Sequence, residues 1–323
     1  MNLPRAVSLA FLAVLLCVHN AAGSAADSGT AARQSLSATM HTRHFIVHYD
    51  PGDPYLAKLM ADSASEQLLR ISRNLGARID TSRPFTLLVY PTHIGFIRGG
   101  GLEGSKFTVG TAEGGSETIS VDASGAFAPA EDVLAHEIAH AILFRVLGPH
   151  VRELPLWLNE GIAQRESEPM TLNQRELVSE AAADGTLIPL TSLAESFPRE
   201  RIALAYAESA SAVGYLVRRH GRQSVRVLIS ELADTGSFDK AMLAATGKTG
   251  DRFASDWYAH TTKRFWVVKL SRAVMATVSA LMAVLVIAAF LVRRKQKIEA
   301  ARRYEQEEFE EALRRQLGNS WWR

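Results

Sequence analysis

The sequence predicts an α+β fold, in which a small mixed sheet packs on a mostly helical domain and one transmembrane helix follows near the C-terminus. Strand-like segments lie before Pro129, and nearly every later segment of the 323 residues has helical periodicity. Strands followed by helices, rather than strict alternation of the two, are typical of α+β domains. The composition is that of a folded protein, and a formal net charge of +2 gives no indication of nucleic-acid binding.

The predicted elements follow from local periodicity. Alternation and β-branched residues predict strands at 44–49, 85–90 and 117–121. Apolar residues at helical spacing predict helices at 55–75, 130–147, 155–165, 172–184, 200–219, 222–233, 237–245 and 250–264. The glycine-rich segment 99–104 formally matches G-x-G-x-x-G, but no helix follows it. We therefore interpret it as a mobile loop and exclude a dinucleotide site.

An apolar segment at the start of the chain predicts a signal peptide over residues 1–25. Arg5 precedes an apolar run at residues 6–18, which is short for a membrane span, and small residues follow it. An uncleaved N-terminal anchor is the alternative. Residues 26–40 are small and polar and predict a flexible leader. Cys17 is the single cysteine, so any metal in a processed chain would be held by His, Asp or Glu.

A second apolar run, residues 273–292, predicts the transmembrane helix. Twenty uncharged residues at about 1.5 Å each cover the roughly 30 Å hydrocarbon core. Because Arg293, Arg294 and Lys295 follow at once, we expect a cytoplasmic C-terminus and an extracytoplasmic domain at residues 41–265, periplasmic or on the cell surface. A buried core helix is the alternative. The charged tail 293–323 could bind the lipid surface or a cytoplasmic partner, and Trp321 and Trp322 could contact either.

A His-Glu-x-x-His pattern at residues 136–140 is the strongest chemical signal. Residues i and i+4 of a helix lie one turn apart on the same face, so the imidazoles of His136 and His140 can reach one ion. Glu137 stands beside them, placed to accept a proton from a metal-bound water. Apolar neighbours such as Ile138 indicate a buried helix. The alternative is a pair of ordinary surface histidines.

A second helix supplies a third candidate ligand. Pro155 suits its first turn, and Glu160 stands among apolar residues, where an unpaired carboxylate would be costly. The nineteen residues between His140 and Glu160 are enough for a helix end, a loop and a return. Two histidines and a glutamate form a known catalytic zinc set with an open fourth position, so one Zn²⁺ ion is the expected cofactor. A salt bridge is the alternative role of Glu160.

These motifs resemble those of the gluzincin metallopeptidases, the group that contains thermolysin. Segments 157–163 (WLNEGIA) and 205–209 (AYAES) are similar to the peptidase-MA-like branch of that group, and the similarity extends over residues 42–264. It implies a zincin-type domain in which His136, His140 and Glu160 hold zinc and Glu137 is the general base. It also implies that the strand ahead of the zinc helix, here Glu117 to Val121, binds extended substrate at the sheet edge.

The sequence departs from the thermolysin pattern at Gln164. Thermolysin-like members carry an acid at this position, four residues after the third ligand, which supports a zinc-bound histidine. The residue that stabilises the oxyanion is not fixed by any motif. Tyr206 is the first candidate, followed by Tyr215 and His220, and a core tyrosine is the alternative for Tyr206.

Three hypotheses of function follow from these observations. The first is a membrane-anchored zinc metallopeptidase that hydrolyses extracytoplasmic peptides or proteins. The second is a catalytically silent zinc domain that binds partners or scaffolds an envelope complex. The third is a metal-free interaction module. Glu137 favours the first hypothesis, because metal binding alone does not require a base beside the ligands.

Overall fold

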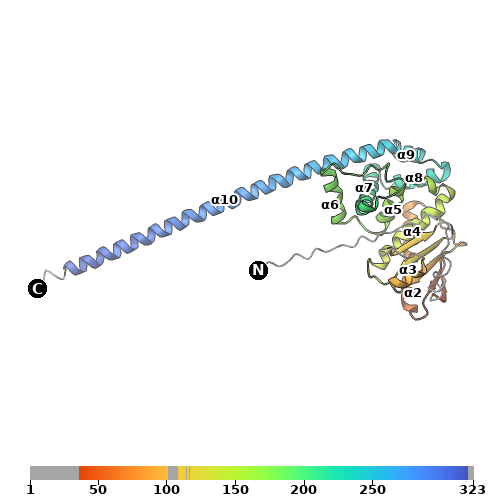
Figure 1. The fold of residues 1–323 in the computed structure, drawn as a ribbon, viewed down its shortest axis with the longest axis horizontal. Coiled ribbons are helices and arrows are strands. Elements are labelled where there is room, and N and C mark those ends of the chain that lie inside the picture. The colour runs from red at the N-terminus through yellow and green to blue at the C-terminus, as the bar shows by residue number, and fades with distance from the viewer. Residues whose placement is uncertain (1–35, 101–107, 114, 116, 319–323) are drawn as a thin grey trace. The chain divides into compact units, whose positions relative to one another are not determined.

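The computed structural model describes residues 36–100, 108–113, 115 and 117–318 (Figure 1). The predicted signal peptide, residues 26–35 of the leader, residues 101–104 of the glycine-rich loop and both Trp321 and Trp322 lie outside the described residues. The chain divides into two compact units, Met1–Thr262 and Lys263–Arg323. The first unit holds the sheet and most of the helices.

Among the described residues, five strands form one small mixed sheet; the sequence predicts the mixed sheet and three of the strands, at 44–49, 85–90 and 117–121. The five strands are β1 (Ala38–His41), β2 (Phe45–Tyr49), β3 (Phe85–Tyr90), β4 (Gly110–Glu113) and β5 (Thr118–Asp122). Their order is β1-β2-β3-β5-β4, with β2, β3 and β5 parallel and both edge strands antiparallel to their neighbours. β1 begins inside the predicted leader, and its Ala38 pairs with Tyr49. Residues 38–40 therefore belong to the sheet rather than to a flexible leader.

The predicted edge strand is not at the edge. β5, which corresponds to the segment Glu117 to Val121, lies between β3 and β4, and Gly110 pairs with Val121 across the β4–β5 ladder. The edge beside the motif helix is therefore β4. Its sequence, Gly-Thr-Ala-Glu, places glycine and alanine at the inward positions, so it lacks the large alternating side chains by which strands are recognised.

Helices make up the remainder of the first unit. The structure confirms the predicted helices and adds the seven-residue helix α3. The helices are α2 (Pro54–Leu75), α3 (His93–Gly99), α4 (Ala130–Leu147), α5 (Leu156–Ser167), α6 (Leu172–Ala183), α7 (Ile202–His220), α8 (Gln223–Thr235), α9 (Phe238–Thr246) and α10 (Gly250–Gly318), with 3-10 turns at Gly148–Glu153 and Arg199–Arg201.

The helix α4 lies at the centre of the first unit. It contacts β4, β5 and α2, and it also contacts α5 and α8 (Figure 1). All eleven residues from Val133 to Leu143 are buried as a result. A helix that is covered all round must bury its polar residues as well. This explains why His136 and His140 are buried.

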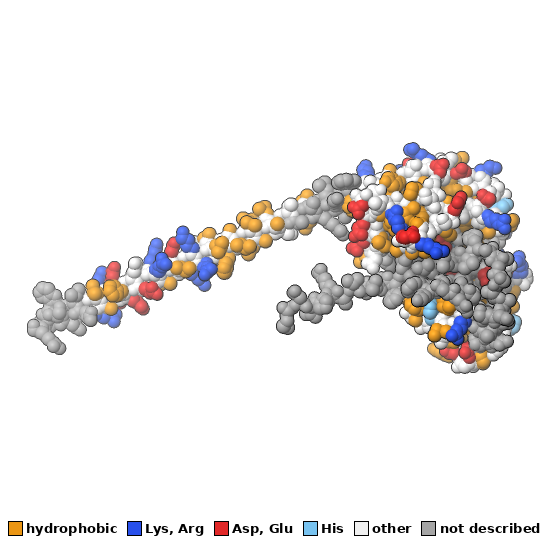
Figure 2. All heavy atoms as spheres, viewed as in Figure 1, with side chains coloured by type: hydrophobic (Ala, Val, Ile, Leu, Met, Phe, Trp, Pro, Cys, Tyr) orange, Lys and Arg blue, Asp and Glu red, His pale blue; other side chains and the backbone are white. Residues whose placement is uncertain are grey.

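The second unit is the C-terminal part of α10. Among the described residues, one helical stretch, Thr277–Arg315, is long and apolar enough to cross a membrane. Figure 2 shows its apolar side chains as a continuous belt, followed by mixed acidic and basic side chains. The described apolar residues from Val274 to Val292 are exposed. Burying such side chains in the hydrocarbon core of a membrane is energetically favourable. The helix therefore supports a membrane anchor.

Candidate metal centre

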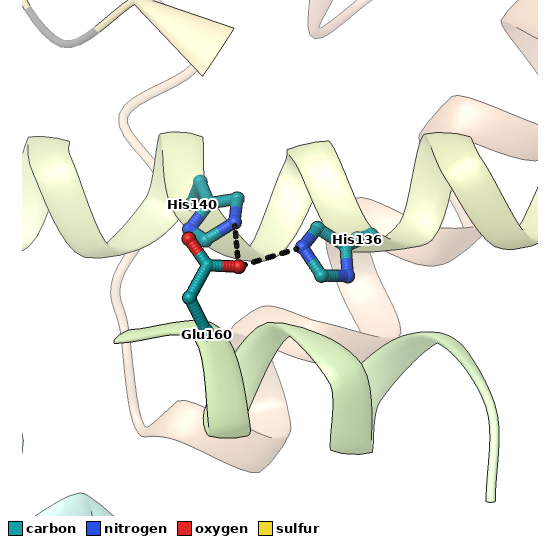
Figure 3. A group of neighbouring side chains, drawn as sticks. All are labelled: His136, His140 and Glu160. Carbon is teal, nitrogen blue, oxygen red and sulfur yellow. Dashed lines mark ion pairs between the residues drawn. The ribbon is translucent and has the colours of Figure 1, made fainter. Parts of the chain in front are cut away.

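The two histidines of the motif face the same point in space. His136 and His140 are one turn apart on α4, and their ring centroids are separated by 4.7 Å. Both side chains are buried, with exposed fractions of 2% and 0%. Figure 3 shows both rings turned toward the neighbouring helix α5.

Glu160 on α5 completes the group. Its Oε2 lies 3.4 Å from Nε2 of His136 and 3.7 Å from Nε2 of His140 (Figure 3). One possible ligand atom from each of the three residues lies within 4.8 Å of the others. Such spacing suits a single ion with bonds of about 2.0–2.2 Å to each atom.

The chemistry of the three residues fits a metal ion. Nε2 of His136 and Oε2 of Glu160 are buried and accept no hydrogen bond within the described chain. Burial lowers the pKa of His136 and so favours its neutral form, which has a free lone pair. Burial opposes ionisation of Glu160, but His140 and His136 outweigh it and lower the pKa of Glu160 to about 2. Neutral imidazole and ionised carboxylate are the forms that bind metals.

Asn159 orients His140. Oδ1 of the buried Asn159 lies 3.0 Å from Nδ1 of His140, so it can accept the Nδ1 proton and leave Nε2 facing Glu160. Gln164, by contrast, donates to Glu168 at 2.9 Å. Among the described contacts, His140 is therefore supported by Asn159, and Gln164 bonds to Glu168 rather than to a histidine. The motif at residues 157–163 contains Asn159 but indicates no role for it, because its partner His140 lies nineteen positions away on another helix.

Glu137 lies between α4 and the edge strand. A Cβ atom built on Gly110 of β4 would lie 2.7 Å from Oε1 of Glu137, so the glycine leaves the room that this carboxylate fills. Oε2 of Glu137 is buried without a hydrogen-bond partner among the described residues. Burial raises the pKa of Glu137 to about 8; His140 opposes the increase and Glu160 adds to it.

Tyr206, the first candidate for stabilising the oxyanion, is buried on α7. It is 5% exposed and packs edge-on against Phe197, with ring centroids 5.1 Å apart. Tyr215 packs against Phe253 at 5.6 Å. The residues that the structure brings together as a possible metal-binding group are His136, His140 and Glu160.

A buried helix that carries His-Glu-x-x-His, a second helix that supplies a glutamate, and a small mixed sheet beside them define a metallopeptidase-like fold. Comparison with protein families matches residues 63–263, more than half of the chain, to the Peptidase MA superfamily, and the chain belongs to this superfamily. Its resemblance to the peptidase-MA-like group is thereby confirmed. No curated protein matches the chain.

Proposed function

We propose that this chain is a membrane-anchored zinc metallopeptidase that hydrolyses peptide bonds of extracytoplasmic polypeptides. The observation that carries the proposal is the buried group of His136, His140 and Glu160 with the carboxylate of Glu137 next to it. His136, His140 and Glu160 would hold one zinc ion. When bound, zinc supplies a Lewis acid that polarises the scissile carbonyl and acidifies a water molecule.

The residues of the chain provide orientation and proton transfer. Asn159 fixes the tautomer of His140 through the contact at Nδ1. Glu137 is the general base, which takes a proton from the attacking water and later delivers it to the leaving amine. Its buried position beneath β4 keeps it close to a substrate bound along that strand. Tyr206 remains a candidate for stabilising the oxyanion.

The edge strand β4 is the proposed substrate-binding strand. It pairs with β5 on one side, and no described strand pairs with its other side, where a further strand could add. An extended polypeptide that adds to this edge would be held by backbone hydrogen bonds, which do not depend on side-chain identity. We therefore propose broad sequence preference.

The membrane topology follows from the two apolar segments. A cleaved signal peptide would export the domain at residues 41–265, and the span at 273–292 would retain it at the membrane. The tail at 293–323 would then face the cytoplasm, where it could bind a partner.

Replacing the base tests the mechanism. Glu137→Gln keeps the shape of the side chain but removes its basicity, so we expect peptide hydrolysis to fall by about 10²–10⁴-fold. Zinc content, measured by elemental analysis, should remain at one ion per chain. Cleavage of a mixed peptide library followed by mass spectrometry gives the rates.

The outcomes separate the hypotheses. Equal cleavage by Glu137→Gln and the parent would show that Glu137 is not the base. Bound zinc without any cleavage by the parent would instead support the silent zinc-binding scaffold. Absence of metal from protein purified without chelators would favour an interaction module.

A further inference from the structure

A pocket lies on the side of α5 that faces away from the candidate metal centre. Ile162, Arg165 and Glu166 of α5 line it. At 3.6 residues per turn, these positions lie roughly 140–240° around the helix from Glu160. The pocket is therefore separate from the group of His136, His140 and Glu160.

Four helices form the pocket, and its floor is aliphatic. The end of α2, the middle of α5, the second half of α7 and the start of α8 contribute residues to it. The enclosed volume is about 110 Å³. A single water needs roughly 10–15 Å³ on this scale, so a small organic molecule can enter. The aliphatic residues of the floor are Leu75, Ile162, Val213, Val217 and Val225.

The polar part of the pocket is strongly basic. Arg165, Arg222 and Arg226 line it, and Glu166 is its one acidic lining residue. Glu166 already accepts hydrogen bonds from Nη1 of Arg70 at 3.0 Å and Nδ2 of Asn74 at 2.8 Å. Its charge is thus balanced by Arg70, which lies outside the lining.

The positive charges of the three lining arginines are not neutralised by any ion pair among the described residues. Nε of Arg226 donates to the backbone oxygen of Asn74 at 3.0 Å, a neutral partner. No ion pair within the described chain involves Arg165 or Arg222, and both are exposed. Positive charge gathered around an aliphatic floor is complementary to a small amphiphilic anion.

We propose that this pocket binds an aliphatic carboxylate. The planar guanidinium fork of arginine pairs with a carboxylate through two parallel hydrogen bonds, and the floor would take the aliphatic group. Two sources offer this chemistry: the C-terminus of a polypeptide that ends in a branched aliphatic residue, and a free short-chain acid. The inference goes beyond the proposed peptidase function and does not depend on it.

Titration calorimetry on the full-length protein in detergent tests the proposal. The probes are N-acetylvaline, which mimics a polypeptide end, and isovalerate, a free acid. We expect saturable binding of at least one, and the better of the two identifies the source. Arg165→Gln and Arg222→Gln should each weaken binding about tenfold, as expected for loss of a charge-assisted hydrogen bond. Val217→Phe, at a half-buried lining position, should fill the pocket and abolish binding.

Two controls make the result specific. Arg175→Gln removes an exposed arginine of α6 outside the pocket and should leave binding unchanged. N-acetylvalinamide, which lacks the negative charge, should not bind. Absence of saturable binding, equal binding of the amide, or unchanged binding by the double variant of Arg165 and Arg222 would overturn the proposal. The last result would place the carboxylate elsewhere, for example at the metal centre. Calorimetry needs no catalytic turnover, so failure here leaves the proposed peptidase function untouched.

Discussion

At the scale of single residues, the candidate site consists of buried side chains with shifted pKa values: burial lowers the pKa of His136 and raises that of Glu137, whereas the histidines lower that of Glu160. The helical spacing of His136 and His140 made their convergence predictable, because helix geometry alone brings i and i+4 together. The role of Asn159 was not predictable in the same way. Its contact with His140 depends on how α5 docks against α4, and that docking is a tertiary property.

Asn159→Ala should weaken zinc binding. Without its acceptor, the Nδ1 proton of His140 is no longer fixed, and residues that orient a metal ligand typically affect affinity by 10–100-fold. Competition with a chromogenic chelator measures the change. Gln164→Ala is the matched control, because Gln164 bonds to Glu168 and should leave zinc affinity unchanged. Equal losses in both variants would argue against the assigned role of Asn159.

We expect the titration of Glu208 to make the stability of the folded protein depend on pH. Glu208 is fully buried on α7, and both carboxylate oxygens accept the backbone N–H of Ile188, at 3.0 and 3.2 Å. Burial raises the pKa of Glu208 from 4.5 to about 8, although the Ile188 amide and Arg201 oppose this increase. The folded state therefore holds a proton that the unfolded chain has already lost, and its stability falls as pH rises from about 4.5 to about 8.

Glu208→Gln should reduce this loss of stability. The amide oxygen can still accept from Ile188, but the side chain cannot ionise. Thermal unfolding at pH 5 and pH 8.5 should show a smaller decrease in Tm for the variant than for the parent. Glu137 titrates in the same range in both proteins, so its effect cancels. An equal decrease in Tm with pH in the variant and the parent would show that Glu208 does not cause the loss of stability.

At the scale of helices and strands, the predicted segments correspond to elements of the structure, and the elements that were missed are the short ones β1, α3 and β4. α4 is a long, mostly apolar segment that contains neither proline nor glycine, whereas β4 consists of Gly110, Thr111, Ala112 and Glu113. The glycine at position 110 of β4 is explained by its close neighbour on α4 rather than by strand propensity. Gly110 contacts Glu137 so closely that the edge of the sheet and the proposed base form one packed unit.

Gly110→Ala tests that close packing. The new Cβ would lie 2.7 Å from Oε1 and 2.8 Å from Cγ of Glu137, against about 3.5–4.0 Å for ordinary contacts between carbon atoms. We expect Glu137 to be displaced and peptide hydrolysis to fall at least about tenfold, while zinc content is retained. Gly115→Ala is the control, because a Cβ there meets nothing within 4 Å. Full activity of Gly110→Ala would show that Glu137 has room to adjust.

At the scale of the whole molecule, the candidate site and the apolar span lie in different compact units. The candidate site lies entirely within Met1–Thr262, and the second compact unit, Lys263–Arg323, carries the apolar span. Composition indicates the apolar span because its twenty uncharged residues differ from the mixed pattern of residues 41–265.

A chain that ends at residue 262 should therefore be released from the membrane. In cells, we expect the full-length protein to sediment with membranes and to resist extraction at alkaline pH, because burying the 273–292 span in lipid is strongly favourable. The shortened chain should appear in the soluble fraction and keep the same Tm within a few degrees, since its core is complete. Replacing four alanines of the span by valine is the control for sequence change and should not alter sedimentation. Membrane retention of the shortened chain would mean that another segment, such as an uncleaved apolar N-terminus, anchors the protein.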